Sequence, residues 1–394
     1  MAPELSNDVL DIDLPVEPEA VLRVVHAHRS AYVEFVRRLA EMESPSTHPS
    51  AQHDWQAFIA DALADLGFET THLPGQDTGG CLYARPHQRP HAAPVQLLLG
   101  HGDTVWDLGT VERMPVHVSN GRLHGPGIFD MKAGLASIVF ALRTLHRLGA
   151  DPPVTPVVLM TSDEEIGSFE SRPHIERLAA RANRTYVLEP ALGLQGKIKT
   201  TRKGTGDLEL VVRARRTEVG NAVVLELSRL VQHLYSLNEP SRGVTVNVGT
   251  IDGRPRRDRP EGRLAVDVRV PTVEDARRVD AAIRSIEASR PDLTVDVHGE
   301  MDRDPMEATP ANRCLWNRAR QLGQALGLSL TEGRSGGASD GNLTSPLTAT
   351  LDGLGAVGDG AHAQHEFIEI DATLDRCALL ALLLLDDPVP PSVQ

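Results

Sequence analysis

Five short segments of the chain concentrate histidine, aspartate and glutamate, most of them beside glycine. Imidazole and carboxylate groups together form the donor set that suits Zn²⁺, Mn²⁺ or Co²⁺. Three of the segments follow a run expected to be a strand, and ligands gather at the carboxyl ends of strands in open α/β sheets. We therefore expect a metal site at such an edge. In chain order the segments are Gly100–Val105, His124–Lys132, Ser162–Gly167, Leu188–Pro190 and Gly358–His362.

Each segment taken alone also has an ordinary structural explanation. The pair His101 and Asp103 is typical of a hydrogen-bonded loop, and adjacent glutamates such as Glu164 and Glu165 usually lie on a solvated surface. Asp130 stands directly before an expected helix, which is the position of a helix N-cap. The order and spacing of all the segments together favour the metal site.

The elements that must position these segments are those of a mostly parallel sheet. Val95–Leu99 and Val157–Met160 are short apolar runs bounded by glycine or proline, and they alternate with an expected helix at Met131–Leu148. This rhythm predicts an α/β fold in which helices cover the sheet. Further helices are expected at 19–39, Trp55–Leu66, Ala311–Leu326 and Ala372–Leu385.

Residues 207–297 show a different pattern of expected strands and helices. Strand and helix patterns alternate there in the order βαββαβ, which predicts an inserted ferredoxin-like small domain. We expect residues 19–206 and 298–394 to form the metal-binding catalytic domain, preceded by an acidic leader at 1–18. The small-domain elements are expected at Leu208–Val212, Val219–Leu237, Val244–Ile251, Leu264–Val270, Val273–Ile286 and Leu293–Val297.

Composition narrows the class of partners and the compartment. The 394 residues carry 40 Lys and Arg against 54 Asp and Glu, and this net charge of −14 disfavours nucleic acid and anionic membranes as partners. A hydrophobic share of 41% is ordinary for a globular protein. The three cysteines have no paired spacing, and the apolar run Ala378–Leu385 is far shorter than the roughly 20 residues that span a bilayer. We expect a cytoplasmic protein.

The motifs together resemble those of the dizinc metallohydrolases that include glutamate carboxypeptidase, acetylornithine deacetylase and succinyl-diaminopimelate desuccinylase. The likeness extends from about Ala20 to Pro388. It is greatest to the glutamate carboxypeptidases, because Glu189-Pro190 and Arg334–Asp340 resemble sequences in those enzymes. The motifs that carry it are Gly100–Val105, Gly125–Lys132, Glu164–Ser168 and Gly358–Glu366.

The resemblance implies a cofactor of two divalent metal ions per chain. Zinc is the first expectation, with cobalt or manganese as alternatives. In such a site His101 and Glu189 would hold one ion, Glu165 and His362 would hold the other, and Asp130 would bridge the two. A site of this kind cleaves an amide bond with metal-activated water.

The resemblance also implies two catalytic roles and a set of substrate contacts. Glu164 would be the general base, and Asp103 would accept the other ring N–H of His101 and so fix its tautomer. Arg303 matches a family arginine whose guanidinium group binds the substrate carboxylate through two parallel hydrogen bonds, like a fork. Gly337 and Ala338 complete the expected substrate-binding residues on the catalytic domain. The expected substrate is a small N-acyl amino acid or glutamyl-type conjugate with a free carboxylate.

Two departures from the family pattern fall on the small domain. The family's His-x-Gly loop, which reaches the partner subunit's active site in a dimer, looks deleted within Val212–Ala222. Arg257 stands where the family has an asparagine, and we expect it to act as a substitute substrate-binding donor. The resemblance implies that the small domain serves for dimerisation or as a lid, and a homodimer through this domain remains the expected assembly. Because of the departures, altered chemistry such as acyl transfer, or a non-catalytic metal-binding role, stays open.

A serine hydrolase is the remaining alternative. Gly337–Gly341 matches the Gly-x-Ser-x-Gly pattern of a nucleophile elbow. Such an elbow requires a strand immediately before it, whereas Glu332–Gly336 has the composition of a loop. We therefore favour the metallohydrolase.

Overall fold

The computed structural model describes residues 14–88, 94–215, 220–253 and 261–390. Its larger body is built on a six-stranded sheet with the order β1-β2-β6-β3-β7-β14. Strand β3 pairs in parallel with β6 and β7, β14 pairs in parallel with β7, and β1 and β2 form an antiparallel edge. The expected mostly parallel α/β fold is confirmed. The strands are β1 Phe68–Leu73, β2 Cys81–Pro86, β3 Val95–His101, β6 Thr155–Thr161, β7 Ala182–Val187 and β14 Ala349–Leu351.

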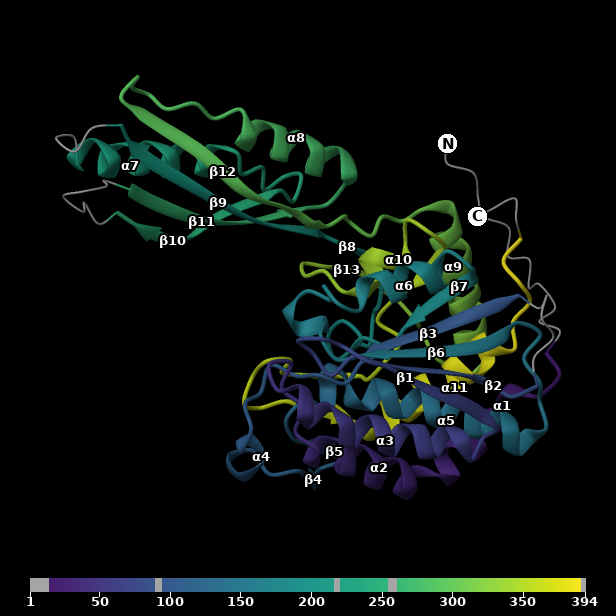
Figure 1. Cartoon of the computed structure of the whole chain (residues 1–394). Helices are drawn as coiled ribbons and strands as arrows, with labels where there is room; N and C mark the ends of the chain where they lie inside the picture. Colours follow the sequence, from purple (N-terminus) through teal and green to yellow (C-terminus); the bar gives the residue numbers. More distant parts are fainter. Residues whose placement is uncertain (1–13, 89–93, 216–219, 254–260, 391–394) are drawn as a thin grey trace, which may run out of the picture.

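Helices cover both faces of this sheet (Figure 1). Every residue of β3 is buried, which is the pattern of a strand that is covered on both sides. Alternate residues of that strand belong to different cores: Leu98 packs with the helices of one face, whereas Leu97 and Leu99 pack with the other. The first face carries α1 Pro18–Ala27, α2 Arg29–Glu41, α3 Gln52–Ala64, α5 Ala133–Leu148 and α11 Ile370–Leu384. The second face carries α6 Arg172–Ala179 and α10 Asp340–Thr344, and α9 Pro310–Ala325 packs along β14.

The smaller body is a four-stranded antiparallel sheet with two helices, and it projects from the larger one (Figure 1). Its strands lie in the order β10-β11-β9-β12. Buried and more exposed residues alternate along β11, so one face of the sheet packs against the helices. The βαββαβ order that the sequence predicts is confirmed. The elements are β9 Gly204–Ala214, α7 Gly220–Ser236, β10 Thr245–Asp252, β11 Glu261–Val270, α8 Val273–Arg284 and β12 Leu293–Arg303.

Short elements between the large ones shape the edge of the sheet. Strands β8 and β13 pair in parallel, and β4, β5, β15 and β16 form a small antiparallel sheet. The expected helix at 19–39 is divided at His28, whose backbone leaves the helical range between α1 and α2. The bounds are α4 Thr110–Arg113, β4 His117–Ser119, β5 Arg122–His124, β8 Ile198–Arg202, β13 Glu332–Ser335, β15 Gly358–Asp359 and β16 Phe367–Glu369. Single helical turns lie at η1 Pro49–Ala51 and η3 Glu164–Ile166. The segment η2 Ile128–Lys132 is kinked, because the backbone of Asp130 and Met131 leaves the helical range.

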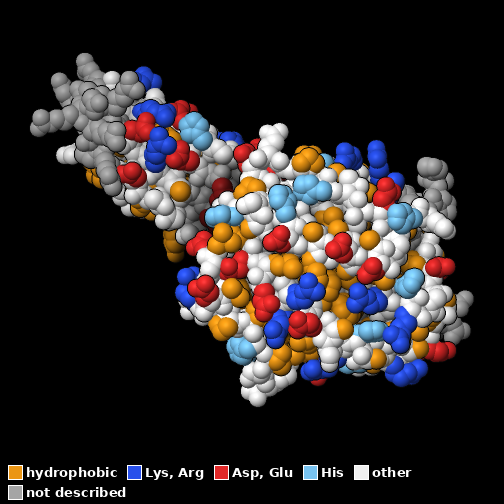
Figure 2. All heavy atoms as spheres, turned by 60° about the horizontal axis from the view of Figure 1, so that its bottom comes forward, with side chains coloured by type: hydrophobic (Ala, Val, Ile, Leu, Met, Phe, Trp, Pro, Cys, Tyr) orange, Lys and Arg blue, Asp and Glu red, His pale blue; other side chains and the backbone are white. Residues whose placement is uncertain are grey.

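The surface carries charges of both signs. On the face shown in Figure 2, acidic and basic side chains are interspersed over the larger body, with apolar side chains between them. Among the described residues, no helix combines the length and the apolar character needed to cross a bilayer.

Candidate metal centre

Three neighbouring strands deliver most of the predicted metal ligands to one edge of the sheet. His101 is the last residue of β3, Glu165 lies in the η3 turn shortly after β6, and Glu189 follows β7 by two residues. Because β6, β3 and β7 are parallel and adjacent, their carboxyl ends meet at this edge. The fold therefore gathers side chains that lie far apart in the sequence.

Asp130 and His362 reach the same place from two loops. Asp130 lies in the η2 turn before α5, and His362, with a φ of 60°, lies between β15 and β16. The carboxylate of Glu366 accepts backbone N–H groups from Gly127 at 2.8 Å, Phe129 at 2.8 Å and Asp130 at 3.0 Å. Glu366 thereby fixes the loop that presents Asp130.

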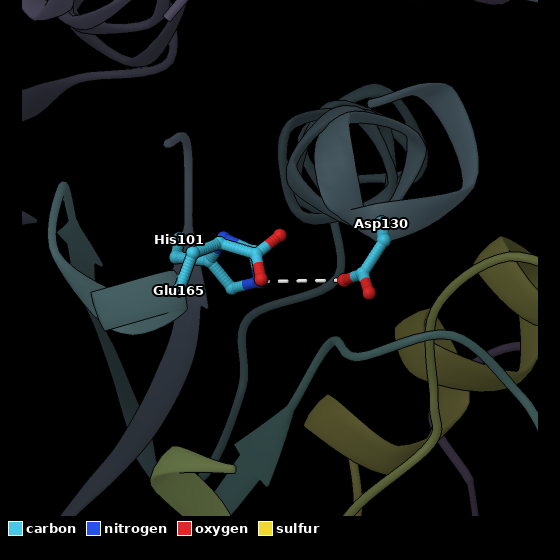
Figure 3. A group of neighbouring side chains, drawn as sticks. All are labelled: His101, Asp130 and Glu165. Atoms are coloured by element: carbon cyan, nitrogen blue, oxygen red, sulfur yellow. Dashed lines mark ion pairs between the residues drawn. The ribbon is translucent and has the colours of Figure 1, made fainter. Parts of the chain in front are cut away.

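The ligand atoms form two groups that share Asp130. Its Oδ1 atom lies 3.4 Å from His101 Nε2, and its Oδ2 atom lies 3.4 Å from His362 Nε2. Glu189 Oε1 is 3.3 Å from His101 Nε2, and Glu165 Oε2 is 3.1 Å from His362 Nε2. Two ligand atoms bound to one tetrahedral zinc ion are about 3.3 Å apart, so both groups have the spacing of a metal site. Figure 3 shows Asp130 facing His101 and Glu165.

The burial of these groups also fits bound cations. Asp130 Oδ1 and Glu165 Oε1 are buried and have no hydrogen-bond partner within the described part of the chain. A buried carboxylate oxygen without a partner is unfavourable, and a divalent cation would compensate it. Hydrogen bonds to Asp130 and Glu165 raise the pKa of His362 to about 10, which again reports a strongly negative environment. The residues present therefore fit two divalent ions.

Asp103 is fully buried and stabilises the turn that carries the two glutamates. Its carboxylate accepts the backbone N–H groups of Glu164 at 3.3 Å and Glu165 at 3.1 Å, and the Ser46 hydroxyl at 2.7 Å. His101 Nδ1 lies 3.0 Å from the Asp103 carbonyl oxygen but 3.5 Å from the carboxylate. The nearest acceptor for the ring is thus the backbone of Asp103, and this differs from the sequence-based expectation. The turn after β3 brings that carbonyl back toward the imidazole.

Glu164 lies beside the predicted metal ligands and pairs with Arg303. The Nη1 atom of Arg303 donates to Glu164 Oε1 at 3.0 Å, and Nη2 donates to the Ser168 hydroxyl at 2.6 Å. Asp340 Oδ1 also lies 3.5 Å from Arg303 Nη2. Burial raises the pKa of Glu164 well above that of an ordinary carboxyl group, although Arg303 opposes the shift. A carboxylate with raised proton affinity next to metal ligands suits proton transfer.

A comparison with protein families identifies the class of this site. Residues 97–386 match the model described as Peptidase family M20/M25/M40. The chain belongs to this family.

Curated relatives of this M20 chain are hydrolases. Carboxypeptidase G2 of Pseudomonas sp. (strain RS-16) is 27% identical over 354 residues, which cover 84% of this chain and 82% of that protein. The succinyl-diaminopimelate desuccinylase of Stenotrophomonas maltophilia is 27% identical over 341 residues, 80% of this chain and 89% of that enzyme. The family resemblance noted in the sequence is confirmed, and the chain is a metallohydrolase.

Solved structures share the fold over nearly the whole chain. Aminopeptidase PepT from Bacillus cereus matches with a TM-score of 0.75 and 17% identity, covering 91% of this chain and 98% of that structure. A dinuclear metal-binding M20 peptidase from Bacillus subtilis matches with a TM-score of 0.69 and 14% identity, covering 91% and 98%. These matches support the α/β architecture.

The serine that resembles a nucleophile is a structural residue in this M20 chain. Glu332–Ser335, expected as a loop, forms the short strand β13. Ser339 is nevertheless fully buried, and its hydroxyl donates to Asp352 at 2.6 Å and accepts the N–H of Gly341 at the start of α10. These bonds occupy the hydroxyl as a helix cap.

Arg202 is a site residue that the sequence did not reveal. Its guanidinium is buried and donates to Glu189 Oε2 at 2.7 Å and to both oxygens of Asp352 at 2.7 and 3.1 Å. It also donates to the carbonyl oxygens of Gly337 and Ala338, at 3.2 and 3.1 Å. Arg202 thus connects a predicted metal ligand to the predicted substrate loop. No local motif marks it, because its partners are distant in sequence.

A cavity of about 350 Å³ opens onto the predicted ligands. Asp130, Glu164, Glu165, Glu189 and His362 line it, together with Gly337 and Ala338. Its cationic wall consists of Lys199, Arg202, Arg269 and Arg303. Arg257, the last of the predicted substrate contacts, lies outside the described residues.

Proposed function

We propose that this M20 chain is a two-metal amidohydrolase. Its substrate would be a small N-acyl amino acid or glutamyl-type conjugate with a free carboxylate. The observation that carries the proposal is the pair of ligand groups sharing Asp130, whose nearest atoms are 3.1–3.4 Å apart. The names of the curated relatives, a carboxypeptidase and a desuccinylase, support an amide as the bond that is cleaved.

The proposed metal ligands are those that the two groups contain. His101 and Glu189 would hold one ion, Glu165 and His362 the other, and Asp130 both. Bound divalent ions lower the pKa of water and polarise an amide carbonyl. Zinc is the proposed metal, because the donor set is imidazole and carboxylate.

Glu164 would act as the general base. Its carboxylate takes a proton from the attacking water and delivers it to the nitrogen of the departing amine. Asp103 supports this role because its carboxylate fixes the Glu164 and Glu165 backbone N–H groups. Arg303 holds Glu164 in the structure described here and would offer its fork to the substrate carboxylate.

The proposed assembly is a homodimer through the small domain. Strand β10 is an edge of the four-stranded sheet, and an edge strand offers unpaired backbone groups. Large apolar side chains on α7 and β10 are exposed, with Leu225 at 69%, Tyr235 at 76% and Ile251 at 59%. Such exposure supports burial against another chain. The cytoplasm is the proposed compartment, and three free cysteines support it.

A metal-loaded substrate screen tests the proposed function. Zinc-loaded protein is incubated with N-acyl amino acids and with α- and γ-glutamyl conjugates, and products are read by mass. We expect an added water and release of an amine that carries a carboxylate. Loss of that activity on chelation and its absence in Glu164→Gln would tie it to this site. No hydrolysis of any compound by the fully loaded protein would contradict the proposed function.

A further inference from the structure

Lys199 places an ammonium group in the cavity, and no side chain or backbone group in the described part of the chain accepts a hydrogen bond from it. It is the second residue of strand β8, its side chain is only 10% exposed, and it lines the cavity beside the predicted ligands. The closest carboxylate oxygen, Glu189 Oε2, is 3.7 Å from Nζ, which is beyond hydrogen-bond distance. That oxygen already accepts Arg202 at 2.7 Å.

Each of the other cations on the cavity wall donates side-chain hydrogen bonds to protein acceptors. Arg202 donates to Glu189 and Asp352, and Arg303 donates to Glu164 and Ser168. Arg269 donates to Asp267 at 3.1 Å and to the carbonyl oxygen of Gly336 at 3.2 Å. Among the described lysines and arginines that line the cavity, Lys199 therefore retains free N–H groups.

Lys199 and Glu164 both lie close to Glu189 in this cavity. Carboxylate oxygens of Glu164 and Glu189 lie within 4.8 Å of each other, and Lys199 lies next to the second of these. A substrate amide bound over Glu189 would then lie within reach of both the Glu164 carboxylate and the Lys199 ammonium group. The first group can take a proton from the attacking water, and the second can donate a hydrogen bond to the carbonyl oxygen.

We propose that Lys199 is a catalytic residue that donates a hydrogen bond to the oxygen of the attacked amide. This inference rests on the proposed function, because it assumes amide hydrolysis at this cavity. A fixed cation aimed at the position where negative charge develops stabilises the transition state.

The bond changes balance with Lys199 keeping its proton. Water forms a C–O bond to the carbonyl carbon, its proton moves to Glu164, and the carbonyl π electrons move to the oxygen that Lys199 contacts. The C=O bond then re-forms, the C–N bond breaks, and the proton on Glu164 passes to the leaving nitrogen. The products are a carboxylic acid and an amine, with no further reactant.

Kinetics on a substrate found in the screen form the first arm of the test. Lys199→Met keeps the length of the chain but removes the ammonium, so kcat should fall by roughly 10²–10³ with KM little changed. Lys199→Arg should recover part of the loss. The matched control is Lys197→Met, because Lys197 lies on the same segment but does not line the cavity. Metal content is measured for every variant at saturating zinc.

If Lys199 only held Glu189 in place, the defect would be one of metal binding. A kcat loss that vanishes when Lys199→Met is fully loaded with zinc overturns the proposal, as does a parental kcat in that variant. Hydrolysis by the parent protein in the same assay tests the proposed function independently of Lys199.

Ligand binding forms the second arm and needs no turnover. The probe is the phosphinate analogue of N-acetylglutamate, whose tetrahedral P–O⁻ group stands where the amide carbon would be attacked. Its ketomethylene analogue, which has a neutral carbonyl group at that position, is the reference. By calorimetry on zinc-loaded protein, Lys199→Met should weaken phosphinate binding by about 10- to 100-fold and weaken binding of the ketomethylene compound much less. Equal phosphinate binding by the parent and Lys199→Met, including none by either, overturns the proposal.

Discussion

Replacing Arg202 with methionine should destabilise the larger body, and most strongly when the protein is free of metal. Arg202 and Asp352 are a buried ion pair, with side chains 3% and 0% exposed. Methionine fills much of the same volume but leaves the carboxylates of Asp352 and Glu189 without their strongest partner. Asp352 keeps hydrogen bonds from the Ser339 hydroxyl and the Gly353 N–H, which stabilise a charge less than a guanidinium does.

The magnitude follows from the burial of the pair. Removing one partner of a buried ion pair costs about 3–5 kcal/mol, because the remaining charge is left uncompensated. For a domain of this size, such a loss lowers the melting temperature by roughly 5–8 °C. Saturating zinc should restore part of the stability that Arg202→Met loses, since a bound cation would compensate the charge of Glu189 but not that of Asp352.

Scanning calorimetry of chelated and zinc-loaded protein measures both effects. Arg85→Met is the matched control, because Arg85 pairs with Glu69 on the surface at 2.9 Å with a side chain that is half exposed. That variant should melt with the parent protein. If Arg202→Met also melts with the parent in the chelated state, the ion-pair reasoning is refuted.

Four further substitutions separate the roles assigned to other residues. Glu164→Gln should keep its metal but lose a factor of roughly 10²–10⁴ in kcat, whereas Glu165→Ala should lose metal. Elemental analysis measures the metal content, and kinetics measure kcat. The reverse result for the two variants would show that their roles are exchanged. Arg303→Lys keeps the charge but loses the fork, so KM for a carboxylate substrate should rise, and unchanged kinetics would remove Arg303 from the site. Glu366→Ala should weaken zinc binding by about 10- to 100-fold in a chelator competition, because Asp130 would lose its fixed loop, and parental affinity would contradict that role.

The parts of the fold that the sequence predicts are those with a strong local signal. The apolar run Val95–Leu99 predicted β3 because a strand buried on both faces needs no polar alternation. The insertion was predictable because period-2 strands such as Leu264–Val270 alternate with amphipathic helices. The break at His28 was not predictable, since the apolar spacing continues across it.

The candidate site likewise contains residues that the sequence predicted and residues that it did not. Residues such as His101 and Asp130 were selected because glycine-rich motifs surround them, and the structure brings them to 3.4 Å. The roles of Arg202 and Lys199 were not predicted, because the acidic residues that they lie next to are distant in the sequence. Asp352 is 150 residues from Arg202 along the chain, so no local pattern connects them.

The two-metal centre itself is tested most directly by anomalous diffraction from crystals of the zinc-loaded protein. We expect two zinc peaks per chain, one contacting His101 and Glu189, the other contacting Glu165 and His362, with Asp130 between them. In His101→Ala and His362→Ala, the peak on the altered side should weaken or disappear. A single zinc ion in the parent protein, or two ions away from Asp130, would contradict the two-metal centre.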